Sequence, residues 1–158
     1  MLHNSGFFVL AHNIRSLHNV GSIFRTSDVF AVDKLFLTGY TGHPPQPKLE
    51  KVALGADKTV SWEYHASPVR LIKKLRQEYP KLLVVGLENN LPKGYVATPM
   101  ASFKGHYPLL LVLGEEVSGI SKKLLPLCDE FLEIPQFGSK ESLNLSVAYG
   151  IAAFLLRK

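Results

Sequence analysis

Two glycine-bearing loops in the last third of the chain carry side chains that suit a polar or cationic ligand. The first loop follows the apolar run 109–113 and spans 114–119, with two consecutive glutamates inside it. The second begins at Ile134 and leads to the segment 142–146, Ser-Leu-Asn-Leu-Ser. An apolar run that stops at glycine and acid is typical of a buried strand that delivers a loop to the edge of a sheet, where open α/β proteins bind ligands. We therefore expect the active site in these loops.

The chemistry of these loops leaves two interpretations open. Backbone groups freed at Gly114 and Gly138 can contact a ring edge such as that of adenine. Glu116 either pairs with a basic side chain or attracts a positively charged ligand. Alternatively, it is a carboxylate at a helix N-terminus, where the helix dipole favours negative charge.

Three other catalytic or binding motifs are absent from the chain. The loop 114–119 has the glycine spacing of a phosphate-binding P-loop, but Ile120 and Ser121 follow where that motif needs lysine and then serine or threonine. No G-x-G-x-x-G follows the first apolar run, which argues against a Rossmann dinucleotide site. Ser118 and Ser142 lack the G-x-S-x-G turn of a hydrolase nucleophile.

The histidines and the single cysteine do not support a metal site. The histidines at positions 3, 12, 18, 43, 65 and 106 show neither H-x-x-x-H nor Cys/His ligand spacing, so we expect no metal. Cys128 stands alone, which excludes an internal disulfide and fits the reducing cytosol, so we expect a cytoplasmic protein. We interpret Cys128 as a small buried hydrophobic residue, with a catalytic thiol as the alternative.

Length and composition indicate one globular domain. The chain has 158 residues, of which 46% are hydrophobic and 20% charged, so it can bury a core. Its apolar runs are too short to cross a bilayer, and the N-terminus lacks the basic start and cleavage pattern of a signal peptide. The net charge of +5 is compatible with RNA or DNA as a partner without requiring either.

Short apolar strands alternate with helical patterns along the chain. Strands are expected at 7–11, 35–37, 60–64, 82–87, 109–113 and 131–134, the third of them at an edge. Helices are expected at 19–32, 47–54 and 68–79, and from about 142 to the end. This alternation predicts an α/β fold, with a mostly parallel sheet and helices on both faces, in a single domain over residues 1–158.

The first and last helices hold the remaining polar candidates. In the first helix, Asn19 is expected as the N-cap, and Gly21 allows a close approach to the first turn. Arg25 lies on a polar stripe, and solvation of its guanidinium is the simplest interpretation. The last helix is apolar nearly all round, so it belongs in the core or at a dimer interface, where Asn144 would be a buried polar residue that needs hydrogen-bond partners.

Three segments together resemble the signatures of the SpoU/TrmH branch of the SPOUT methyltransferases. Residues 19–26, Asn-Val-Gly-Ser-Ile-Phe-Arg-Thr, resemble the first signature, N-x-G-x-x-x-R. Residues 113–119, Leu-Gly-Glu-Glu-Val-Ser-Gly, resemble the second, G-x-E-x-x-G. Ile134-Pro135 followed by 142–147 resembles the third, I-P and then S-L-N-x-S-V. Each is weak alone, but the three occur in the family's order and cover nearly the whole chain.

The resemblance implies a fold and an activity that composition does not indicate. The α/β sheet would carry a deep trefoil knot over about 112–150, which is the SPOUT fold. The cofactor would be S-adenosylmethionine, held in the knot by five residues: Leu87, Gly114, Ile134, Ser142 and Leu143. The protein would be a homodimer that methylates a ribose 2′-hydroxyl of tRNA or rRNA.

The resemblance also implies roles for polar residues of the site. Proposals for the family give the part of the base to the residue matching Arg25. Because the pKa of arginine exceeds about 12, our hypothesis is that Arg25 orients the phosphate and stabilises the developing alkoxide. Asn19, Glu116 and Asn144 would hold Arg25 and the methyl donor in register.

RNA would lie across the body of the dimer, because the chain has no counterpart of the separate RNA-binding domain that some relatives carry. The candidate contacts are Arg15, Lys48, Lys51, Lys122 and Lys123, although a solvated charged face is the simpler interpretation. Two alternatives to ribose methylation remain. One is a catalytically silent, knotted RNA-binding dimer, which the intact polar signature residues argue against, and the other is a SPOUT enzyme that methylates an RNA base.

Overall fold

The computed structural model describes residues 6–157, and its centre is a seven-stranded sheet in the order β3-β2-β1-β6-β4-β7-β5. Every pair of neighbouring strands is parallel. The strands are β1 (Phe7–His12), β2 (Lys34–Thr38), β3 (Trp62–His65), β4 (Leu83–Leu87), β5 (Thr98–Pro99), β6 (Leu109–Leu113) and β7 (Glu130–Glu133). The expected parallel α/β fold is therefore confirmed, with β3 at an edge of the sheet as the sequence predicted.

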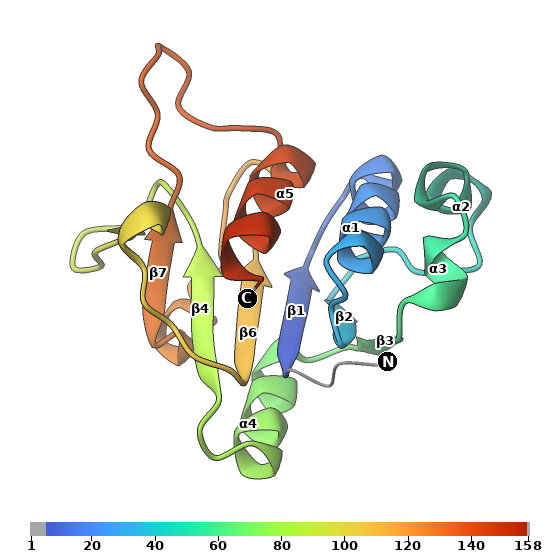
Figure 1. The fold of residues 1–158 in the computed structure, drawn as a ribbon, viewed down its shortest axis with the longest axis horizontal. Coiled ribbons are helices and arrows are strands. Elements are labelled where there is room, and N and C mark those ends of the chain that lie inside the picture. Colours follow the sequence, from blue (N-terminus) through green and yellow to red (C-terminus); the bar gives the residue numbers. More distant parts are fainter. Residues whose placement is uncertain (1–5, 158) are drawn as a thin grey trace.

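Five α-helices and two short 3₁₀ helices accompany these strands in the described part of the chain. They are α1 (Leu17–Val29), α2 (Pro47–Ala53), α3 (Ala56–Thr59), α4 (Pro68–Glu78), α5 (Leu145–Leu156), η1 (Met100–Ser102) and η2 (Leu125–Leu127). Helices α1 and α5 lie side by side on the sheet (Figure 1). A buried hydrogen bond of 2.7 Å between Ser27 Oγ and Tyr149 OH joins them.

The sheet separates two hydrophobic cores, which explains why its strands are continuously apolar. Along β1, Phe7 and Val9 belong to the core formed with α1, α2 and α5. Phe8 and Leu10 point the other way, into the core formed with α4 and the segment around η2. A central parallel strand is covered on both faces, so neither set of alternate side chains is left to water.

The start of the first helix differs from the sequence-based expectation. The helix begins at Leu17, and its N-cap is Ser16, whose Oγ accepts a hydrogen bond from the backbone N–H of Asn19 at 3.2 Å. The prediction that Asn19 is the N-cap was therefore wrong. A serine three residues upstream serves the same purpose, which leaves the Asn19 side chain available for another partner.

The last helix also differs, both in its start and in its surroundings. It begins at Leu145, with Asn144 as an exposed N-cap that accepts from Ser146 N at 2.9 Å and from Ser146 Oγ at 2.7 Å. The expectation of a buried Asn144 was wrong, because the helix starts later than its apolar pattern. Only one side of α5 enters the core, and apolar side chains remain exposed on the other: Val147, Ile151, Phe154 and Leu155. Among residues 6–157, no helix is long and apolar enough to span a membrane.

Candidate functional site

The loops that follow β4, β6 and β7 meet at the carboxyl edge of the sheet. Glu88, directly after β4, accepts a hydrogen bond from the backbone N–H of Ile120 at 3.0 Å. Its neighbour Asn89 donates to the carbonyl of Ile134 at 2.8 Å and accepts from the N–H of the same residue at 3.2 Å. The loop after β4 therefore holds both glycine-bearing loops in place.

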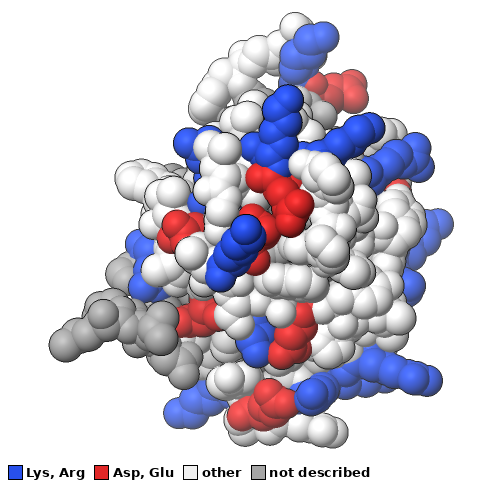
Figure 2. Space-filling view, turned by 90° about the vertical axis from the view of Figure 1, so that its right-hand side faces the viewer, with Lys and Arg blue, Asp and Glu red and all other residues white. Residues whose placement is uncertain are grey.

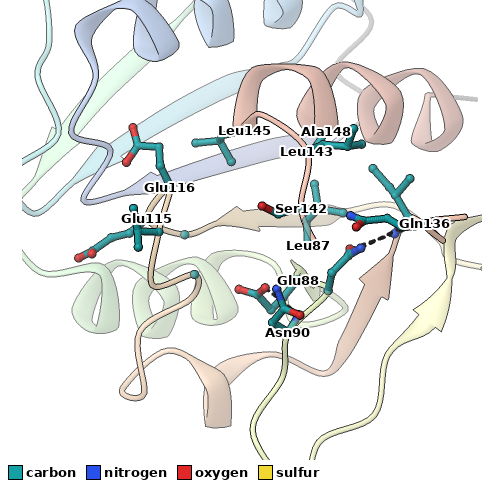
Figure 3. Close-up of a pocket in the computed structure, with 15 residues that line it drawn as sticks. Leu87, Glu88, Asn90, Glu115, Glu116, Gln136, Ser142, Leu143, Leu145 and Ala148 are labelled. Carbon is teal, nitrogen blue, oxygen red and sulfur yellow. Dashed lines mark hydrogen bonds between the residues drawn. The ribbon is translucent and has the colours of Figure 1, made fainter. Parts of the chain in front are cut away.

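A pocket of about 670 Å³, open to solvent, lies between these loops. Glu115 and Glu116 lie on one side of it, and Gln136, Ser142 and Leu143 on the other (Figure 3). Its lining includes all five residues that the resemblance assigns to the cofactor: Leu87, Gly114, Ile134, Ser142 and Leu143. Backbone and small polar groups converge on an apolar floor, as in many sites for small organic molecules.

Gly114 is required by the tight closure of its loop. The backbone N–H and carbonyl of Glu115 bond to those of Gly119, each at 3.0 Å. A Cβ at Gly114 would lie 2.3 Å from the carbonyl carbon of Gly119, too close for any side chain. Gly119 itself has a φ of +73°, and a Cβ there would overlap the Glu88 carboxylate. The glycines thus bring the loop backbone close to the pocket.

Glu116 is held by donors from the start of α1. Its carboxylate accepts from the backbone N–H of Ser16 at 3.0 Å and of Arg15 at 3.2 Å, and from the side chain of Asn19 at 3.2 Å. Burial opposes the charged form, but the backbone hydrogen bonds and the Asn19 amide outweigh it and lower the pKa of Glu116. A carboxylate stabilised in this way is a weak base and a strong structural anchor.

The other two catalytic candidates, Arg25 and Asn144, form no hydrogen bond with Glu116 or Asn19 in the described part of the chain. Arg25 is exposed on α1 and makes no hydrogen bond or ion pair within residues 6–157. Asn144 caps α5 beside Ser142 and Leu143, but its own side chain bonds to Ser146. Neither residue lines the pocket.

Three of the five basic candidates share one hollow. Arg15, Lys48 and Lys51 line a space of about 1120 Å³ between the start of α1 and α2. Lys122 and Lys123 lie on the loop after β6, where the charge of Lys123 contributes, after burial, to lowering the pKa of His12. Figure 2 shows basic side chains across the upper part of one face, interspersed with acidic ones. The basic charge is therefore distributed over several elements.

Asn13 is a functional candidate that the sequence analysis missed. Its side chain donates to Glu115 at 3.3 Å and accepts from the backbone N–H of Tyr40 at 2.9 Å. Its φ is +54°, in the left-handed region that asparagine tolerates better than most residues. An asparagine shortly after a buried apolar run is the only sequence signal that points to this connection.

The environment of Cys128 bears on the alternative of a catalytic thiol. The thiol is partly buried against the core, and burial raises its pKa to about 12, so it is protonated and unreactive at neutral pH. Among residues 6–157, no group of His, Cys, Asp and Glu side chains is arranged to hold a metal ion.

The chain is similar in sequence to known RNA-modifying proteins. The model of the SpoU rRNA methylase family matches residues 6–154. A tRNA (guanosine(18)-2′-O)-methyltransferase of Aquifex aeolicus is 29% identical over 147 residues, which cover 92% of this chain and 66% of that protein. A 23S rRNA (guanosine-2′-O-)-methyltransferase, RlmB, of Salmonella typhi is 28% identical over 153 residues, which cover 97% of this chain and 60% of that protein. The chain thus spans less than two thirds of the length of these relatives.

Solved structures show the same architecture. The SpoU methyltransferase AviRb from Streptomyces viridochromogenes, in complex with the cofactor AdoMet, superposes with a TM-score of 0.84 at 25% sequence identity. The match covers 96% of this chain and 57% of AviRb.

Proposed function

Because the chain belongs to the SpoU rRNA methylase family, we propose that it transfers the methyl group of S-adenosylmethionine to a ribose 2′-hydroxyl of tRNA or rRNA. The observation that carries this proposal is the pocket between the three loops. Two of the three family signatures lie in loops that line this pocket. The remaining signature lies on α1, and its Asn19 donates a hydrogen bond to Glu116 in the pocket wall. Two relatives carry names for this same reaction on tRNA and on rRNA.

The pocket suits the cofactor in its chemistry. The space between the loops is about 670 Å³ including the part that is open to solvent. Leu87, Ile134 and Leu143 offer apolar surface, and the backbone of the loop 114–119 offers polar groups for a heterocycle edge. The nearby ionised glutamates favour a cationic ligand such as a sulfonium. When bound, the cofactor supplies a methyl group already activated on positively charged sulfur.

The remaining task of the protein is to position and activate a weakly acidic hydroxyl. Glu116 is engaged by several N–H donors and has a lowered pKa, so we assign it an organising role and not that of a base. Asn19 fixes Glu116 to α1. Arg25, which is free of intramolecular partners in the described chain, would bind the RNA phosphate and stabilise the developing alkoxide. Asn144 would fix the start of α5 next to Ser142.

We propose further that two copies of the chain pair through α5, whose exposed apolar side chains need a cover. Residues 1–158 would form one methyltransferase domain, and about 112–150 would be threaded as a trefoil knot. The strand order, with β7 between β4 and β5, is compatible with that threading. An RNA substrate and a lone cysteine support a cytoplasmic location.

The test is methyl transfer from labelled S-adenosylmethionine to total tRNA and rRNA prepared from a strain that lacks the gene. We expect label in RNA, recovered after digestion as a 2′-O-methylated nucleoside. RNA binding without transfer would favour the silent dimer instead, and label on a base would favour the base-methylating alternative.

A further inference from the structure

A second hollow lies on the outer side of the loop after β6 and shares a wall with the cofactor pocket. Arg15, Tyr40, Glu115 and Ser118 line it, and its volume is about 860 Å³ including its open mouth. Residues 115–117 line both spaces. Figure 3 shows the Glu115 side chain directed away from Ser142 and Gln136.

We propose that this hollow, which we call the base seat, receives the base of the nucleotide whose ribose is methylated, and that it selects guanine. The link to ribose methylation rests on the function proposed above. The shared wall makes the arrangement possible, because a nucleotide whose base occupies the base seat has its ribose next to the loop that also borders the methyl donor.

Tyr40 provides the aromatic surface that a base needs. Its side chain is 53% exposed, and among the described residues it stacks on no other ring. The nearby Tyr64, in contrast, contacts His43 and donates its hydroxyl hydrogen bond to Gly39 O at 2.6 Å. An exposed aromatic ring beside a charged hollow is the usual platform for an unstacked RNA base.

Glu115 provides the base selectivity. Hydrogen bonding from Ser118 is the main cause of its lowered pKa, with burial opposing and with Asn13, Tyr40 and the charge of Arg15 adding to the effect. The carboxylate is therefore ionised at neutral pH and can only accept hydrogen bonds. Its oxygens bond to Asn13 and Ser118 and interact with Tyr40, and since a carboxylate has about four lone-pair sites in all, acceptor capacity remains for a ligand.

Guanine is the base that matches such an acceptor pair. Its Watson–Crick edge presents two adjacent donors, the ring N1–H and the exocyclic amino group. Adenine and cytosine present one donor next to an acceptor, and uracil presents one donor between two acceptors, which a carboxylate repels. The chemistry of Glu115 thus disfavours the other three bases.

Asn13 connects the two sides of the base seat before any ligand arrives. Its side chain bonds to Glu115 and to the backbone of Tyr40, which ties the acceptor to the segment that carries the aromatic ring. Gly39 makes room for this connection, since a Cβ there would overlap the Asn13 amide oxygen. Contacts formed in advance lower the entropy that is lost on binding.

The flanking surfaces suit the rest of the nucleotide chain. Arg15 lines both the base seat and the adjoining basic hollow with Lys48 and Lys51. Base, ribose and phosphate would therefore follow a continuous path from Tyr40 past Arg15, with neutralised phosphates adding affinity that weakens as salt rises.

The first test uses nuclear magnetic resonance titration of the full chain with GMP, AMP, CMP and UMP. We expect GMP to shift the amide signals of Tyr40 and of 115–118, and to bind about tenfold or more tightly than UMP, the scale of one bidentate base contact. Tyr40→Ala should weaken GMP binding about tenfold, whereas the matched control Tyr40→Phe, which keeps the ring, should change it less than about twofold. Glu115→Gln should abolish the preference for GMP over UMP.

Two controls decide between the base seat and mere disturbance of the loop. Tyr40→Ala and Tyr40→Phe should bind S-adenosylmethionine with the affinity of the wild type, because Tyr40 does not line the cofactor pocket. Equal binding of the four nucleotides, no shift at Tyr40, or an unaltered preference in Glu115→Gln would overturn the base seat.

The second test separates the failure of this inference from failure of the proposed function. RNA methylated by the wild-type protein should yield 2′-O-methylguanosine on digestion. A different 2′-O-methylated nucleoside would overturn guanine selection while leaving ribose methylation intact. Absence of any transfer, combined with GMP binding at Tyr40 and Glu115, would overturn the proposed function and leave the base seat standing.

Discussion

The side chain of Asn19 donates a hydrogen bond of 3.2 Å to Oε1 of Glu116 and thereby ties α1 to the loop after β6, 97 residues away in sequence. The same carboxylate also accepts from the backbone of Arg15 and Ser16. One ionised group thus organises the start of α1 against the wall shared by the cofactor pocket and the base seat. To act as a base, Glu116 would have to lose hydrogen bonds from its three N–H donors when it accepts a proton. This cost supports an organising role for Glu116.

The first prediction concerns the pH dependence of stability that Glu116 creates. Its pKa is lower in the folded protein than its ordinary value of 4.5. The stabilisation is therefore fully present above about pH 4.5 and is lost as the pH falls through the folded pKa. Glu116→Gln should be less stable than the wild type at pH 7, with a smaller difference at pH 3.5. Urea unfolding at both values measures this, and a constant difference would refute it.

The second prediction concerns Gly114. Gly114→Ala places a Cβ against the backbone of Gly119 and must open the loop. We expect the dissociation constant for S-adenosylmethionine to rise about tenfold or more, from the loss of one or two backbone contacts. Gly138→Ala is the matched control, because a Cβ there meets nothing within 4 Å. Calorimetric titration distinguishes them, and equal affinities would show that the loop does not bind the cofactor.

The third prediction concerns Arg25, whose side chain is exposed and unpaired within the described chain. If its guanidinium stabilises the alkoxide, Arg25→Lys should lower kcat by about a hundredfold. The affinity for S-adenosylmethionine should not change, because Arg25 does not line the pocket. Near-normal turnover of Arg25→Lys with intact cofactor binding would rule out a specific guanidinium role.

The fourth prediction concerns the exposed side of α5. Val147 and Phe154 are 51% and 67% exposed, which is unusual for a helix so apolar. Phe154→Glu should convert a dimer into a monomer of 17.5 kDa, because a buried unpaired charge at an interface is strongly unfavourable. Val96→Glu, on an 84% exposed residue far from α5 in sequence, is the control. Sedimentation velocity reads the mass, and an unchanged dimer in Phe154→Glu would place the interface elsewhere.

The architecture was largely predictable, because buried parallel strands appear in the sequence as uninterrupted apolar runs. Strands β1 and β6 were predicted from the apolar runs 7–11 and 109–113, and helices α1 and α4 from the amphipathic patterns between them. The ends of helices were less predictable. Ser16 and Asn19 are both good N-caps by type, and only the backbone geometry shows that Ser16 caps the helix.

Some features of the site were likewise predictable from the sequence, and others were not. By itself, the sequence determined the parallel α/β fold and the glycine loops, since strand burial and glycine turns depend on local pattern. Only the tertiary structure decided that Asn19 bonds to Glu116, that Asn13 joins Tyr40 to Glu115, and that Arg25 lies apart from them. Those relationships join segments up to 102 residues apart, and long-range contacts follow from how strands order in the sheet, which no local pattern records.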